Sequence, residues 1–135
     1  MQLAANENCI VTGLEDQVKV FDARMRVLSF AYADAHSSPI ICARATPDLQ
    51  SIVTTSEDST VKVWDVRQQR LLKTYSDDCL QCDSDSKLCI SPNSQFVVVG
   101  TKQGHIAYIN LQDPRDLLDS IVRGEHSAPV IDVLW

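Results

Sequence analysis

The chain has 135 residues, of which 44% are hydrophobic and 22% charged, and its formal net charge at pH 7 is −6. This composition is typical of one globular domain and excludes a disordered chain. No stretch approaches the roughly 18 apolar residues of a membrane-spanning helix, and the opening MQLAANENCIVTG lacks a signal peptide's basic start and apolar run. The acidic charge opposes the phosphate contacts of nucleic-acid binding. We therefore expect a cytoplasmic protein, with the nucleus as the alternative, that binds no nucleic acid and inserts into no membrane.

Short β-strands separated by turn residues follow one another along the chain. We predict strands at residues 40–45, 52–56, 60–65, 70–75, 87–91, 96–101, 105–110 and 120–123. Tight turns separate them at Glu57-Asp58-Ser59 and Lys102-Gln103-Gly104, and Thr-Pro-Asp and Ser-Pro-Asn each follow a strand. The pattern leaves room for one helical turn, at residues 114–118. The predicted fold class is all-β.

An internal repeat of about 45 residues organises these strands. HSSPII at residues 36–41 returns as HSAPVI at residues 126–131, which is two steps of 45. TPDLQSIVTTSEDSTVKVWD from Thr46 aligns without a gap on SPNSQFVVVGTKQGHIAYIN from Ser91. Upstream, IVTGLEDQVKVFDAR from Ile10 matches IVTTSEDSTVKVWDVR from Ile52 once one turn residue is dropped. A period of this length indicates a stacked or circular array, here with about three units of four strands.

One unit carries a recognisable signature. His36 is followed 28 residues later by Trp64-Asp65, with Asp58 in the intervening turn. This pattern resembles the WD repeat, whose units form the four-stranded blades of a β-propeller. The resemblance implies about three four-stranded blades of an incomplete ring: a partial first blade at 1–33, a second at 34–80, a third, degenerate blade at 81–125, and the first strand of a further blade at 126–135. The third unit is degenerate because Gln81 stands where the His is expected.

The resemblance also implies a buried series of hydrogen bonds. The family's indole, hydroxyl, imidazole and carboxylate correspond here to Trp64, Thr54, His36 and Asp58, and Ser56 points to the same face. A hydroxyl, a His and an Asp in one place could alternatively act as nucleophile, base and orienting acid of a hydrolase. A buried and fully bonded network stabilises rather than reacts, so we expect a structural role and no catalytic residue.

The cysteines raise the question of a metal or redox site. Cys79-x-x-Cys82, with Cys89 nearby, has the spacing of half a zinc site, but a second ligand pair is missing. A redox motif needs a helix start in a βαβ unit, which the all-β pattern does not offer. The count of five is odd. We therefore expect reduced thiols, no metal and no cofactor.

Two consecutive units end alike, in Asp22-Ala23-Arg24 and Asp65-Val66-Arg67. An Arg two residues after the Asp is similar to the box of WD-repeat substrate receptors in cullin-four ubiquitin ligases. That similarity implies that Arg24 and Arg67 contact a partner, for which the planar guanidinium fork is suited. A substrate receptor of such a ligase is therefore the alternative function.

The order of segments from FDAR to HSAPVIDVLW, with a Cys-containing stretch at residues 80–85, resembles the last blades of autophagy-related sixteen-like proteins. The function we expect is a non-enzymatic scaffold that binds other proteins or peptides, within a larger propeller and in an autophagy-type assembly. Three blades cannot close a ring, so further blades from the same or another chain are expected partners.

Overall fold

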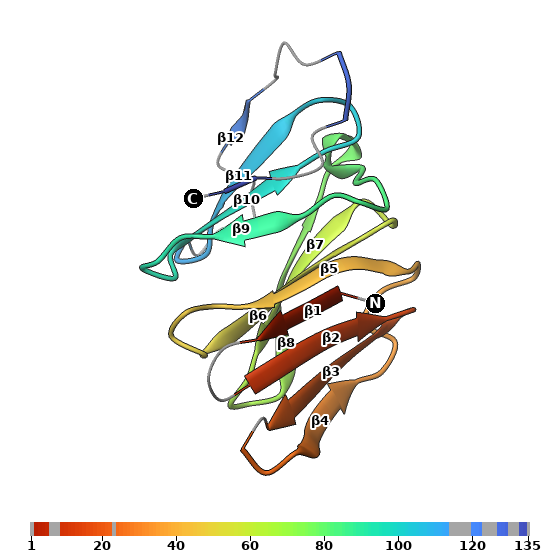
Figure 1. The fold of residues 1–135 in the computed structure, drawn as a ribbon. Coiled ribbons are helices and arrows are strands. Elements are labelled where there is room, and N and C mark those ends of the chain that lie inside the picture. The colour runs from red at the N-terminus through yellow and green to blue at the C-terminus, as the bar shows by residue number, and fades with distance from the viewer. Residues whose placement is uncertain are drawn as a thin grey trace.

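The strands form three four-stranded antiparallel sheets, each in the order of the sequence (Figure 1). The structure, a computed structural model, describes residues 2–5, 9–22, 24–113, 120–122, 127–129 and 133–134. The first sheet contains β1 (Gln2–Ala5), β2 (Cys9–Leu14), β3 (Gln17–Asp22) and β4 (Val27–Tyr32). The second contains β5 (Ile40–Ala45), β6 (Ser51–Ser56), β7 (Thr60–Asp65) and β8 (Arg70–Ser76). The third contains β9 (Leu88–Ile90), β10 (Phe96–Gly100), β11 (Ile106–Asn110) and β12 (Ser120–Val122).

The all-β prediction with four strands per unit is confirmed. The first unit differs from the expected partial blade, because the short β1 pairs with β2 and gives that sheet its fourth strand. The sequence also missed a 3₁₀ turn, η1 (Asp78–Leu80), in which the Asp77 carboxylate accepts from the Cys79 N–H. The helical turn expected at 114–118 lies outside the described residues. So does most of the strand expected at 126–135, of which residues 127–129 and 133–134 are described and are not strand.

The second sheet lies between the other two (Figure 1). Its first strand, β5, lies against β1 and β2 on one side and β9 on the other. Both faces of the second sheet are therefore covered, and β6 is buried at five of its six positions. Within the described residues, no helix is long and apolar enough to cross a membrane.

Two apolar clusters fill the junctions between the sheets. The cluster between the first and second sheets consists of Val18, Val20, Tyr32, Ala35, Ala43, Ile52 and Trp64. The cluster between the second and third sheets consists of Ile41, Cys42, Val53, Val61, Val63, Tyr75, Leu80, Cys82, Leu88, Val97, Val99, Ala107 and Ile109. Because successive strand residues point to opposite faces, β5, β6 and β7 of the second sheet each contribute to both junctions.

The sequence repeat is also a repeat of hydrogen bonds. In the turn after β5 the Thr46 N–H donates to the Ser51 carbonyl at 2.8 Å, and after β9 the Ser91 N–H donates to the Phe96 carbonyl at 2.9 Å. Leu49 and Ser94, which are 45 residues apart, both have a φ of 59°. Equivalent residues therefore adopt the same uncommon left-handed backbone conformation in both units.

We expect Val97→Ala to destabilise the protein by about 2 kcal/mol, because Val97 is fully buried between the second and third sheets. Val98 on the same strand faces the other way and is only half-buried, so Val98→Ala should cost at least about 1 kcal/mol less. Urea unfolding of the two variants measures the difference. Equal losses would contradict the assignment of Val97 to the junction.

Candidate functional site

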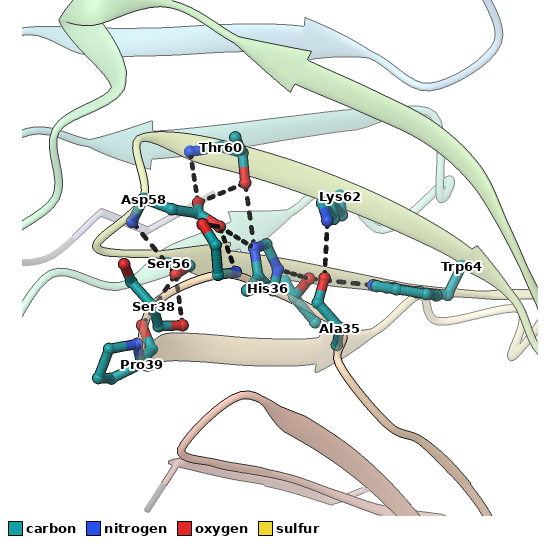
Figure 2. A network of polar contacts seen from close by, with 11 residues as sticks. Ala35, His36, Ser38, Pro39, Ser56, Asp58, Thr60, Lys62 and Trp64 are labelled. Atoms are coloured by element: carbon teal, nitrogen blue, oxygen red, sulfur yellow. Dashed lines mark hydrogen bonds and ion pairs between the residues drawn. The ribbon is translucent and has the colours of Figure 1, made fainter.

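The candidate residues come from three consecutive segments. His36 lies in the connection between β4 and β5, Thr54 and Ser56 lie on β6, Asp58 lies in the β6–β7 turn, and Trp64 lies near the end of β7. The β6–β7 hairpin pairs Thr54 with Lys62 and Ile52 with Trp64, which places Thr54 and Trp64 on one face of the sheet. The structure brings His36 onto that face (Figure 2).

Four of these side chains are joined in series by hydrogen bonds. The Trp64 indole Nε1–H donates to Thr54 Oγ1 at 3.0 Å. Thr54 Oγ1 lies 2.7 Å from His36 Nε2, and His36 Nδ1 lies 3.0 Å from Asp58 Oδ2. Thr54 is completely buried, so both of its contacts form away from water.

The series has one consistent direction of donation. Thr54 Oγ1 accepts from Trp64, so its own hydroxyl hydrogen is free to donate to His36 Nε2. Nε2 then carries no proton, and the Nδ1–H donates toward Asp58 Oδ2 and toward Thr60 Oγ1, which is also 3.0 Å away. The arrangement thus assigns His36 the neutral Nδ1–H tautomer.

Asp58 is surrounded by donors. Its carboxylate accepts from the Thr60 N–H at 3.0 Å, from the Thr60 hydroxyl, and from the Ser37 N–H at 3.2 Å. It thereby fixes both the turn before β7 and the connection that carries His36. With His36 and the Ser37 hydroxyl, at 3.4 Å, included, five donors surround its two oxygens, so it is an anchor rather than a free base.

The pKa values agree with this arrangement. Burial lowers the pKa of His36 below its usual range, although the neighbouring Asp58 carboxylate acts in the opposite direction. For Asp58, burial acts to raise the pKa. The hydrogen bonds from Thr60, His36 and Ser37 outweigh burial and hold the pKa below its usual range. A neutral imidazole beside an ionised carboxylate follows.

Ser56 lies apart from the series. Its hydroxyl contacts the carbonyls of Ser38 and Pro39 at 3.0 and 2.9 Å and accepts from the Asp58 N–H. Sequence analysis missed Lys62, whose ammonium donates to the Ala35 carbonyl at 2.7 Å, and the contribution of Thr60. The sequence pattern could have indicated both residues. Thr60 and Lys62 lie two and four residues after Asp58 and share one face of β7 with Trp64.

Tyr32 joins the first sheet to the second beside this network, and sequence analysis missed it as well. Its hydroxyl donates to the Asp65 carbonyl at 2.8 Å, and its ring centroid lies 4.6 Å from that of Trp64. Burial, with the nearby Asp65 carboxylate, raises the pKa of Tyr32 to about 12. The repeat could have indicated Tyr32, because a tyrosine recurs at the equivalent position of the second unit. Tyr32 pairs with Val18, and Tyr75 pairs with the equivalent Val61.

The connection that carries His36 is also held from the first sheet. The Ala35 N–H donates to the Asp16 carbonyl at 2.8 Å, and the Ile40 N–H donates to the Glu15 carbonyl at 2.6 Å. Asp16 and Glu15 form the β2–β3 turn. The network therefore sits at the junction of two sheets and binds their connection from both sides.

The third unit replaces the network with apolar packing. Val99 and Ile109 occupy the positions of Thr54 and Trp64, and both are fully buried. Gln81, in the position of His36, is exposed, and its carbonyl accepts from the Lys102 N–H at 2.6 Å. The hydroxyl of Thr54 and the indole N–H of Trp64 are thus lost together, whereas His105, at the position of Thr60, has a buried Nδ1 with no hydrogen-bond partner among the described residues.

Cys42, Cys79, Cys82 and Cys89 are free thiols. Burial, with the neighbouring Cys42, raises the pKa of Cys82 to about 12, which keeps this thiol uncharged and unreactive. Among the described residues, no three His, Cys, Asp or Glu side chains are grouped so that they could hold a metal ion.

Arg24 and Arg67 lie in equivalent exposed turns, β3–β4 and β7–β8. Each turn is closed by the carboxylate that precedes the arginine: Asp22 accepts from the Arg24 N–H at 2.8 Å, and Asp65 accepts from the Gln68 N–H at 2.7 Å. The structure thus leaves both arginines exposed at the surface.

Known proteins resemble this chain in sequence and in fold. Residues 26–65 match the WD40 family, described as the WD domain, G-beta repeat. The matched segment begins before β4 and ends with β7, so it contains the whole His36 network.

The similar proteins are 26–28% identical to the chain over the aligned residues. A WD repeat-containing protein on Y chromosome from Drosophila ananassae is 28% identical over 98% of the chain, and the Caenorhabditis elegans periodic tryptophan protein 2 homolog is 26% identical over 92%. Human protein Atg16l2 is 28% identical over 65%. The chain spans only 13–14% of the length of these three proteins.

A solved structure shows the same fold. A chain in the crystal structure of the mitotic checkpoint complex superimposes with a TM-score of 0.82 at 21% identity, over 99% of this chain and 39% of that one. This structural similarity supports the arrangement of three stacked sheets. The WD40 match supports the hydrogen-bond network where the first two sheets meet. Residues 26–65 thus have the sequence of a WD repeat, and the three sheets are blades of a β-propeller.

Proposed function

We propose that the chain is a non-enzymatic scaffold for protein or peptide partners, as part of a larger WD-repeat propeller. The observation that carries the proposal is the saturation of the only Ser/Thr-His-Asp arrangement in the described residues. Thr54 Oγ1 is fully buried and bonded to Trp64 and His36, so no substrate reaches it. The polar side chains of the network fix two blades in place. The exposed turns of these blades remain available to bind partners.

The setting we propose is an autophagy-type assembly in the cytoplasm. The similarity to human Atg16l2 supports it, together with the likeness of the segment order to autophagy-related sixteen-like proteins. The net charge of −6 supports protein rather than nucleic-acid partners. The alternative function, a substrate receptor of a cullin-four ligase, is favoured by one observation: Arg24 and Arg67 are both exposed at equivalent turns.

Affinity capture with the tagged full-length protein from its source cells tests the scaffold. We expect stoichiometric protein partners whose cross-links map to exposed turns of these blades. Recovery of the cullin-four adaptor by the wild type, lost with Arg24→Gln/Arg67→Gln, would establish the alternative function instead. Recovery of no protein in stoichiometric amount would contradict both.

Thr54→Val tests whether the network is structural. The change leaves the Trp64 N–H and His36 Nε2 buried without their partner, so we expect a loss of about 2–4 kcal/mol in the free energy of unfolding. Thr74→Val, at a half-buried position of β8 outside the network, is the control and should cost far less. An ester hydrolysis activity that disappears in Thr54→Val while stability stays unchanged would favour the hydrolase reading.

Stability should fall as the pH drops below about 6.5, the ordinary pKa of His36. Folding lowers this pKa, so between the two values the unfolded chain binds more protons and protonation favours unfolding. Asp58 contributes in a lower window, because its own lowered pKa is reached only below its ordinary value of 3.8. Chemical denaturation between pH 7 and 5 should show a flatter profile for His36→Gln than for the wild type. Identical slopes for the two proteins would refute the assignment.

A further inference from the structure

An apolar groove lies at the outer end of the junction between the first two blades. Its hollow has a volume of about 180 Å³ and is lined by Val20, Phe21, Asp22, Ser29, Phe30, Ala45, Leu49, Ile52 and Val66. These residues come from the ends of β3 and β7, from β4 and from the β5–β6 turn. We call this hollow the outer groove. It has room for one large apolar side chain.

A lysine at the next junction occupies the position that Phe30 has at the first. Phe30 pairs with Val20 and Lys73 pairs with the equivalent Val63, so Lys73 occupies the position of Phe30 in the second blade. The Lys73 ammonium reaches across the junction and donates to the Asp113 carbonyl. Leu111, in the position of Val66, packs against the core there. The side chains at these two positions therefore differ between the junctions, with Phe30 and Val66 at the first and Lys73 and Leu111 at the second.

The surface beside the outer groove is apolar as well. Met25, Val27 and Leu28 are 72%, 50% and 50% exposed and lie in the β3–β4 turn and on β4. Three large exposed apolar side chains in four residues, next to an apolar hollow, are typical of a surface that binds another molecule.

Exposed arginines neighbour lining residues of the outer groove in the sequence, although the chain's net charge is −6 and the lining includes Asp22. Arg24 and Arg26 follow the lining residue Asp22, and Arg67 follows the lining residue Val66; all three are exposed. No ion pair joins any of them to a carboxylate in the part of the chain that the structure describes. The Asp22 carboxylate is occupied by the N–H groups of Arg24 and Met25, at 2.8 and 2.9 Å.

We propose that the outer groove binds an acidic segment of a partner protein, which inserts one large apolar side chain between Phe30 and Val66 and sets its carboxylates against the arginines. Charge complementarity selects this occupant, because exposed arginines attract carboxylates and repel basic segments. The apolar hollow supplies the anchor and the arginines supply the specificity. The inference rests on the proposed scaffold function and names the partner's chemistry.

The test uses the full-length protein and a fluorescein-labelled peptide with a central phenylalanine flanked on each side by two glutamates. We expect saturable binding in fluorescence anisotropy, weakened by salt because the arginine charges are exposed. Two further peptides, one with glutamine for every glutamate and one with a central alanine, should each bind with an affinity at least about tenfold lower. Equal binding of the three peptides would overturn the proposal.

Three variants locate the binding. Arg24→Gln/Arg67→Gln, which changes only exposed side chains, should weaken the acidic peptide about three- to tenfold. Lys102→Gln removes one exposed positive charge in the β10–β11 turn, at the opposite end of the blades, and should leave the affinity unchanged. Phe30→Lys introduces the side chain that stands at this position in the next junction and should abolish binding; circular dichroism checks that it folds. If it does not fold, the arginine variant alone decides.

The outcomes separate this inference from the scaffold function. No binding by the wild type, or equal weakening by Lys102→Gln and the arginine variant, overturns the outer groove as an acidic-segment site while leaving partner capture unaffected. A dimer in sedimentation that Phe30→Lys dissociates would make a second copy of the chain the occupant, and would likewise overturn the proposal.

Discussion

The hydroxyl of Thr54 is the point on which the first two blades depend. It is fully buried and accepts from Trp64 while it contacts His36, whose other nitrogen reaches Asp58. A buried hydrogen bond is strong where water is absent, and an unpaired buried group is costly. These four side chains therefore fix the connection between the blades in one position, since any other position leaves polar atoms unpaired.

The two junctions solve the same packing problem by different chemistry. The first uses directional bonds, with Tyr32 crossing from one blade to the Asp65 carbonyl of the next. The second uses apolar burial, with Val99 and Ile109 at the positions of Thr54 and Trp64. Removing every member of a polar network together is tolerated, whereas removing one member is not. This explains how one repeat can lose the signature and keep the fold.

The packing of the blades determines which groups remain available to a partner. The polar groups of the network hydrogen-bond one another, so the side chains available for recognition lie in the turns and outer strands. There the two junctions differ again, because Lys73 at one occupies the position that Phe30, which lines the outer groove, has at the other. Blades of the same fold thus differ in surface chemistry where their sequences depart from the repeat.

The sequence by itself determined the repeat, the strands and most members of the network, because alternating burial, turn residues and a fixed period are local properties. It did not reveal that β1 completes the first blade, nor that Thr60, Lys62 and Tyr32 join the network. Those contacts connect residues of different strands or blades, and only the stacking of the sheets decides which of them meet. The outer groove belongs to the same class, since Phe30 and Val66 come together only when two blades are packed.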